Sequence, residues 1–305
     1  MNKKQTEKFV QLFVFLVVTI VFIGCRSGGG KAPKKELSID VPKSLELYED
    51  IKQAEKIFNA LPSPLESAML IKSAGARFDA SLLNPIENAN RYVTNKSMAL
   101  NLGIYTCNLS FASLYEQTRL IIDYMNAAKK LADGLGILQA VEQSTIDKLE
   151  ENINNSEIIM EIVSETFLNT NSFLEDNGQP AIAAMTLVGG WFEGLYISCK
   201  LVDMNDFANN KIVSRIIDQK LSIDILINLL ENNNDSPAVA ELITEVQKLK
   251  VVFDKINVTT SPIRPEFDEA SNSTILKSEV TNNITPAVFT ELATTVGEIR
   301  NSFIK

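Results

Sequence analysis

The chain has 305 residues, of which 45% are apolar, and a formal net charge of −9 with no histidine. An acidic surface repels phosphate backbones and anionic headgroups, which argues against nucleic-acid binding and against electrostatic docking on lipid. The absence of histidine removes the usual general base of Ser/His/Asp and Cys/His sites and the commonest transition-metal ligand. We therefore expect no metal and no cofactor.

Residues 1–24 have the pattern of a signal peptide. Lys3, Lys4 and Lys8 precede an apolar run over 9–23. A helix of that length rises about 22 Å, which is less than the roughly 30 Å hydrocarbon core of a bilayer. The pattern therefore favours a cleaved signal over a permanent transmembrane span.

The end of that run, Phe22-Ile23-Gly24-Cys25, resembles the lipobox of bacterial lipoproteins, in which small residues precede a cysteine that is lipidated and becomes the mature N-terminus. The resemblance implies that Cys25 carries the lipid. Residues 25–43 are rich in Gly, Lys, Ser and Pro, the composition of a flexible tether. The alternatives are a plain secretory signal with an incidental cysteine, or an uncleaved N-terminal anchor.

Residues 44–305 are expected to form one helical domain. Their apolar residues recur with a helical period nearly throughout, which predicts an all-α fold, a single bundle of about eight to ten helices. Thr285 and Pro286 are typical of an N-cap and a first helical position. In chain order, helices are expected over 44–60, 63–76, a short segment from 85, 94–115, 116–133, 144–154, 156–175, 179–204, 206–231, 236–256 and 285–303.

Three features of the pattern predict how these helices are arranged. The helices over 94–115 and 116–133 are expected to form a hairpin or a bent rod. The helix over 179–204 is nearly all apolar, which predicts a central position among more polar neighbours. No strand pattern as long as these helices appears in the chain. The segment 257–283 is expected to be a long connection.

A weak internal repeat appears at an offset of 87 residues. It indicates either duplication of a helical hairpin or only the residue preferences of buried helices, and we predict a single domain. The aligned residues are Met98, Leu100, Gly103 and Tyr105 with Met185, Leu187, Gly190 and Phe192.

Two further cysteines, Cys107 and Cys199, lie in apolar helical segments without metal-type spacing. In an oxidising envelope they would form one disulfide or remain as buried free thiols. The sequence leaves both possibilities open.

A single carboxylate, Glu193, stands in the apolar stretch 187–197. Burial of an unpaired carboxylate costs several kcal/mol or raises its pKa, so Glu193 needs a basic group, hydrogen-bond donors or water. Polar residues at helical spacing in 101–108 are candidate donors. The candidate binding residues are Glu193, Trp191, Tyr196, Asn101, Tyr105 and Asn108.

This arrangement has two interpretations. In the first, Glu193 lies in a polar pocket, where it orients a small ligand against Trp191 and Tyr196 or acts as an acid or base. In the second, the polar groups form a structural network that fixes the register of two long helices. Gly190 and Gly194 would then allow a neighbouring helix to approach closely. The second interpretation is favoured.

The same two stretches resemble a known family. Asn-Leu-Gly-Ile-Tyr followed by Asn-Leu-Ser-Phe-Ala, and Gly-Gly-Trp-Phe-Glu-Gly-Leu-Tyr-Ile, look like the signature segments of an uncharacterised family of all-helical bacterial lipoproteins. The resemblance implies a lipid-anchored helical domain and names no activity.

The functional expectation is a membrane-anchored cell-envelope lipoprotein with a binding or scaffold domain. Its partners would be the membrane, through the lipid, and an envelope protein. The alternative is a small-molecule binder or a carboxylate-based enzyme with a pocket around Glu193. Lys31, Lys34 and Lys35 differ from the acidic tethers of surface-exported lipoproteins, which favours an outer-membrane anchor facing the periplasm.

Overall fold

The computed structural model describes residue 72 and residues 76–138, 143–234, 236–262, 264–268, 273–277 and 280–305. These residues form an all-α multi-helix bundle, so the predicted fold class is confirmed. The predicted signal peptide, Cys25, the tether and the helix over 44–60 lie outside the described residues, as does nearly all of the helix over 63–76.

The helices begin close to the residues that the sequence indicates. Thr94 caps α4 in a capping box with Ser97, and Thr285 caps α11 with Pro286 at its first position. One predicted helix, over 206–231, begins later because Asp206 has a non-helical backbone inside the short 3₁₀ segment η4. The bounds are α4 Asn95–Leu114, α5 Thr118–Gly134, α6 Gln143–Glu151, α7 Ser156–Asp176, α8 Pro180–Lys200, η4 Met204–Asn209, α9 Lys211–Asn232, α10 Pro237–Phe253 and α11 Pro286–Phe303, preceded by η1 Ala80–Leu82 and η2 Ile86–Asn90.

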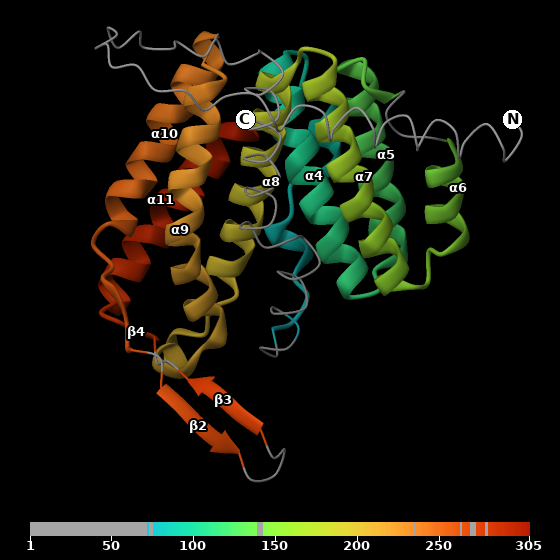
Figure 1. Cartoon of the computed structure of the whole chain (residues 1–305). Helices are drawn as coiled ribbons and strands as arrows, with labels where there is room; N and C mark the ends of the chain where they lie inside the picture. The colour runs from blue at the N-terminus through green and yellow to red at the C-terminus, as the bar shows by residue number, and fades with distance from the viewer. Residues whose placement is uncertain are drawn as a thin grey trace, which may run out of the picture. The chain divides into compact units, whose positions relative to one another are not determined.

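The expectation of a long connection over 257–283 missed the short strands that this segment contains. β1 (Val258–Thr260) pairs antiparallel with β4 (Val280–Asn282), and β2 (Arg264–Asp268) pairs antiparallel with β3 (Ser273–Lys277). These strands of three to five residues are too short to show a clear alternation, although β-branched Val, Thr and Ile favour them. The ribbon of β2 and β3 extends from one end of the bundle (Figure 1).

Two apolar helices form the centre of the bundle. α4 packs against α5, α7 and α8, and α8 also packs against α7, α9 and α11 (Figure 1). This confirms the α4–α5 hairpin and the central position of α8. By length and composition α8 is apolar enough to cross a membrane. However, 72% of its most apolar stretch is buried inside the bundle, as in the core helix of a folded domain.

The close crossing of α4 and α8 depends on two glycines. A Cβ atom on Gly103 would lie 2.0 Å from the Thr186 carbonyl oxygen, and one on Gly189 would lie 2.0 Å from the Leu100 carbonyl oxygen. Gly190 aligns with Gly103 in the weak repeat. A Cβ atom on Gly190 would lie 3.4 Å from the Gly103 carbonyl oxygen, which is an ordinary contact. The expectation for Gly194 is wrong, since a Cβ there would meet only the Cys107 Sγ at 3.7 Å.

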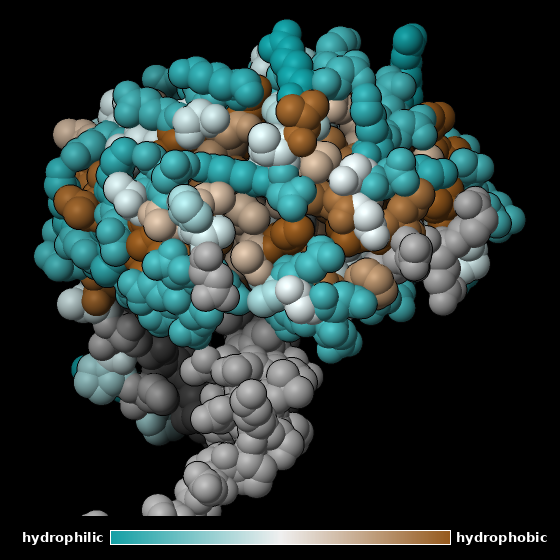
Figure 2. Space-filling model, turned by 90° about the horizontal axis from the view of Figure 1, so that it is seen from above, coloured by the Kyte–Doolittle hydropathy of each residue, from teal (hydrophilic) through white to brown (hydrophobic). Residues whose placement is uncertain are grey.

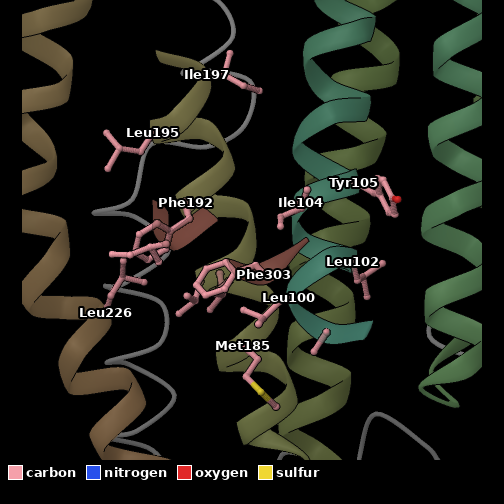
Figure 3. Packing of buried hydrophobic residues seen from close by; sticks show 14 of the residues in the cluster. Leu100, Leu102, Ile104, Tyr105, Met185, Phe192, Leu195, Ile197, Leu226 and Phe303 are labelled. Atoms are coloured by element: carbon pink, nitrogen blue, oxygen red, sulfur yellow. The ribbon is translucent and has the colours of Figure 1, made fainter. Parts of the chain in front are cut away.

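Side chains from α4, α8 and α11 meet in the core. Figure 3 shows Leu100 and Ile104 of α4 pointing toward Phe192 of α8 and Phe303 of α11. The Phe192 and Phe303 rings pack edge to face with centroids 5.4 Å apart. Tyr105 points to the opposite side of α4 (Figure 3). α4 therefore packs inside the bundle with both of these sides (Figure 3).

The surface of the bundle is mixed. Seen from above, hydrophilic side chains form most of the surface, and apolar ones lie between them (Figure 2). The most exposed large apolar side chains among the described residues are aliphatic: Val93, Leu221 and Val251. Single exposed apolar residues of this kind are normal on a folded protein.

Candidate functional site

Glu193 on α8 is fully buried and is paired with Arg300 of α11. The Arg300 Nε atom donates to Oε2 at 2.7 Å, and Nη2 donates to Oε1 at 2.9 Å. This is the bidentate geometry in which a guanidinium binds a carboxylate most strongly. Arg300 is only 4% exposed, so both charges lie in the interior.

Asn108 of α4 completes the coordination of the carboxylate. In the amide orientation that satisfies both neighbours, its Nδ2 donates to Glu193 Oε1 at 2.7 Å, and its Oδ1 accepts from the Asn84 backbone N–H at 3.0 Å. Both carboxylate oxygens of Glu193 are therefore occupied by donors from two other elements.

Asn84 is the centre of the next layer. Its Nδ2 donates to the Tyr92 hydroxyl and to Asn101 Oδ1, both at 3.0 Å. Its Oδ1 accepts from Asn88 at 2.9 Å, and its carbonyl oxygen accepts from the Tyr124 hydroxyl at 3.1 Å. These bonds attach the segment that contains η1 and η2 to α4 and α5.

The same layer binds the last carbonyls of α11, which have no partner inside the helix. Asn101 Nδ2 donates to the Phe303 carbonyl oxygen at 2.8 Å, and the Tyr92 hydroxyl donates to that of Ile304 at 3.3 Å. Arg300 Nη2 also donates to the Leu82 carbonyl oxygen at 3.3 Å. The polar groups thus connect α11 to the rest of the bundle. We define the Glu193 cluster as Glu193, Arg300, Asn108, Asn84, Asn101, Tyr92, Tyr105 and Tyr124.

The aromatic members of the cluster are also bonded. Tyr105 donates to the Pro85 carbonyl oxygen at 2.9 Å, and its ring lies beside those of Tyr92 and Tyr124. Burial raises the pKa of each of these three hydroxyls, so they stay protonated as donors. Tyr196 lies outside the cluster but covers it, since the Arg300 guanidinium lies 4.6 Å from its ring centroid.

The structure does not bring Trp191 to the Glu193 cluster. Its Nε1 donates to Gln219 Oε1 of α9 at 3.0 Å, and its ring packs edge to face on Phe192. Of the six predicted residues, Glu193, Asn108, Asn101 and Tyr105 lie in one hydrogen-bonded group and Tyr196 lies on it. Trp191 lies with α9.

The electrostatics of Glu193 reflect opposing effects. Burial raises the pKa of its carboxyl, and the hydrogen bonds and charge of Arg300, with the Asn108 amide, oppose that rise. A catalytic carboxylate needs an oxygen that can reach a substrate proton. Here both oxygens are held by side-chain donors, so the arrangement stabilises a charge pair in the interior.

Arg300 and Asn84 were not identified from the sequence. Arg300 directly follows Ile299 in the stripe Val288, Leu292, Val296, Ile299 and Phe303, and it lies four residues after Val296. It therefore lies at the edge of the buried face, which makes it one candidate for the cation that Glu193 requires but does not distinguish it from the other cations of the chain. Asn84 is in an irregular segment before Pro85, where the sequence carries no such periodic signal.

No group of three or more acidic or cysteine side chains within the described residues is arranged to hold a metal ion. The cavities among the described residues include one of about 400 Å³ between α6 and α7 and one of about 90 Å³ between α5 and α7. Neither is lined by a member of the Glu193 cluster.

Cys107 and Cys199 are free thiols, so of the two possibilities that the sequence leaves open the structure has the unbonded one. Burial raises the pKa of the Cys107 thiol, and it raises that of Cys199 to about 12. At about pH 8 both groups are then almost entirely protonated thiols, which are poor nucleophiles. We therefore expect both cysteines to react slowly in the folded protein.

We expect N-ethylmaleimide at about pH 8 to leave Cys107 and Cys199 unmodified while it reacts with a free peptide thiol. Both should be modified after unfolding in urea. Peptide mass spectrometry measures the modified fraction at each position. Rapid modification of either cysteine without urea would show that this part of α4 or α8 is open.

Comparison with known proteins gives no relative. No family model, no curated protein and no solved structure matches the chain.

Proposed function

We propose that the protein is a membrane-anchored lipoprotein of a bacterial cell envelope whose helical domain binds or positions an envelope partner. One observation carries the non-catalytic part of this proposal. The only carboxylate in the buried stretch 187–197, that of Glu193, is occupied on both oxygens by Arg300 and Asn108.

The alternative proposal, a small-molecule binder or carboxylate enzyme around Glu193, receives less support. It requires a polar cavity beside Trp191, whereas the Trp191 indole donates to Gln219 of α9. Tyr196, the other aromatic residue of that proposal, covers the Arg300 guanidinium. The polar groups are thus arranged to bind one another.

The anchoring part of the proposal rests on the sequence around Cys25, where an apolar run ends in a lipobox-like stretch before a tether. A lipid on Cys25 would hold the domain at the membrane without basic surface contacts, which an acidic chain lacks. The basic tether favours the periplasmic face of the outer membrane.

Replacing Cys25 by Ala is expected to abolish incorporation of an alkyne-labelled fatty acid in cells, because the acceptor thiol is lost. The wild type should carry the label and begin at residue 25 by mass spectrometry of its N-terminal peptide. Cys107→Ala is the matched control and should keep the label. A labelled Cys25→Ala protein, or an unlabelled wild type, would contradict the anchor.

In-cell crosslinking of the intact protein, followed by mass spectrometry of the purified adducts, tests the partner. We expect one envelope protein to recur at near-stoichiometric yield. A co-purified small molecule that is lost in Glu193→Gln would instead favour the pocket.

A further inference from the structure

A narrow apolar groove lies between α5 and α7, with α4 and Thr186 of α8 as its floor and α6 over it. Its cavity is about 90 Å³, and its lining includes Leu109, Met125, Ile146, Val163 and Phe167. A purely apolar cavity of about 150 Å³ stays free of water and binds benzene. A groove of about 90 Å³ that is partly open to solvent holds part of a hydrocarbon chain and leaves the rest at the surface.

The groove lies at a position that a longer helix, α10, fills in the other half of the bundle. α10, with 17 residues, packs against both α9 and α11, whereas α6, with nine, packs mainly against α7. α5 and α7 flank α4 as α9 and α11 flank α8. The shorter α6 thus leaves apolar surface exposed between α5 and α7. In the other half, α10 covers the equivalent surface between α9 and α11.

Most polar groups around the groove are already bonded. The hydroxyls of Thr106, Thr166 and Thr186 donate to carbonyl oxygens of their own helices at 2.7–2.9 Å. Thr170 on α7 also lines the groove, and its hydroxyl forms no hydrogen bond with a described residue. That hydroxyl is not among the fully buried polar atoms without a partner, so it is accessible and can donate to a ligand in the groove.

The lining contains one charged residue, Lys129 of α5. Its side chain is exposed, and its ammonium forms no ion pair with a described residue. An apolar groove with an available cation at its side is complementary to a hydrocarbon chain that ends in an anion.

We propose that this groove binds a straight-chain aliphatic carboxylate of short or medium length. The chain lies between α5 and α7 beneath α6, and Lys129 and Thr170 are the donors to the carboxylate. The proposal does not depend on the anchor or on an envelope partner, because it uses only the α4–α8 half of the bundle.

The test uses the full chain in phospholipid nanodiscs, with ¹³C-methyl-labelled methionines and octanoate as the probe. Met125 lines the groove, and Met204 lies in the separate segment η4. We expect a saturable shift of the Met125 methyl signal and none of Met204. Empty nanodiscs correct for octanoate that partitions into lipid. Octylamine, with the same chain and the opposite charge, should bind at least about tenfold more weakly.

Two variants examine the assigned contacts. Lys129→Gln should weaken octanoate binding about five- to tenfold, and Lys211→Gln, which removes an exposed charge on α9, should leave it unchanged. Ala128→Leu fills the groove and should abolish the Met125 shift with the melting temperature retained or raised. An unshifted Met125, equal binding of octylamine, or binding that survives Ala128→Leu would each overturn the proposal.

Discussion

Replacing Arg300 by Met is expected to lower the free energy of unfolding by about 3–5 kcal/mol, because it leaves the buried Glu193 carboxylate without its cation. The change also removes the bond to the Leu82 carbonyl oxygen. Urea denaturation followed by circular dichroism measures the loss. The matched control is Arg215→Met, since the Arg215–Asp218 pair is exposed and should contribute less than about 1 kcal/mol.

The Arg300→Met protein should also become more stable as the pH falls. Burial raises the pKa of the Glu193 carboxyl. The variant lacks the hydrogen bonds and the charge of Arg300, which are the main interactions that oppose this rise. A carboxyl whose pKa is higher in the folded than in the unfolded state contributes stability below its unfolded pKa and loses it as the pH rises through the folded pKa. Stability should therefore rise from about pH 8 to about pH 5. A pH-independent loss would show that Glu193 is not the affected group.

Gly103→Ala is expected to destabilise the protein by about 3 kcal/mol or more. The added Cβ atom would lie 2.0 Å from the Thr186 carbonyl oxygen and 2.6 Å from the Gly190 nitrogen, so two backbones must separate. Thermal denaturation measures the effect. The control is Gly194→Ala on α8, whose Cβ atom would make only an ordinary contact with Cys107 Sγ.

The control also predicts the sign of a smaller effect. Ala has a helix propensity about 1 kcal/mol better than Gly, so Gly194→Ala should be neutral or stabilising. If Gly103→Ala proved as mild as Gly194→Ala, α4 and α8 would not cross as closely as described.

The sequence predicts the helices well because their signals are local. Thr94 and Thr285 cap α4 and α11, and the apolar run of α8 places that helix at the centre. The strands after α10 were missed because each has only three to five residues. That is too few to show a clear alternation of apolar and polar side chains.

The sequence predicted only part of the candidate site. A carboxylate in an apolar helix requires a partner, and this argument identifies Glu193 and the donor Asn108. It does not show which of the cations pairs with Glu193, because Arg300 is 107 residues away and only the packing of α11 on α8 brings them together. Asn84 was missed for a similar reason, since its bonds to Asn101, Asn108 and Tyr124 depend on the packing of its segment on α4 and α5.

The glycines show the same limit. A helical glycine in an apolar run indicates close approach by a neighbour, and the sequence pointed to Gly190 and Gly194. The tight contacts are at Gly103 and Gly189, because the direction of each Cα–H bond depends on how α4 crosses α8.

The central claim is that the Glu193 cluster holds the bundle together and does not serve as a catalytic site. A double-mutant cycle with Glu193→Gln, Arg300→Met and the double variant, measured by urea denaturation of the full chain, tests it most directly. The account predicts that each single change costs about 3–5 kcal/mol and that the double change costs at least about 2 kcal/mol less than their sum. Near-wild-type stability of Glu193→Gln, with no coupling to Arg300, would contradict the claim and favour a functional carboxylate.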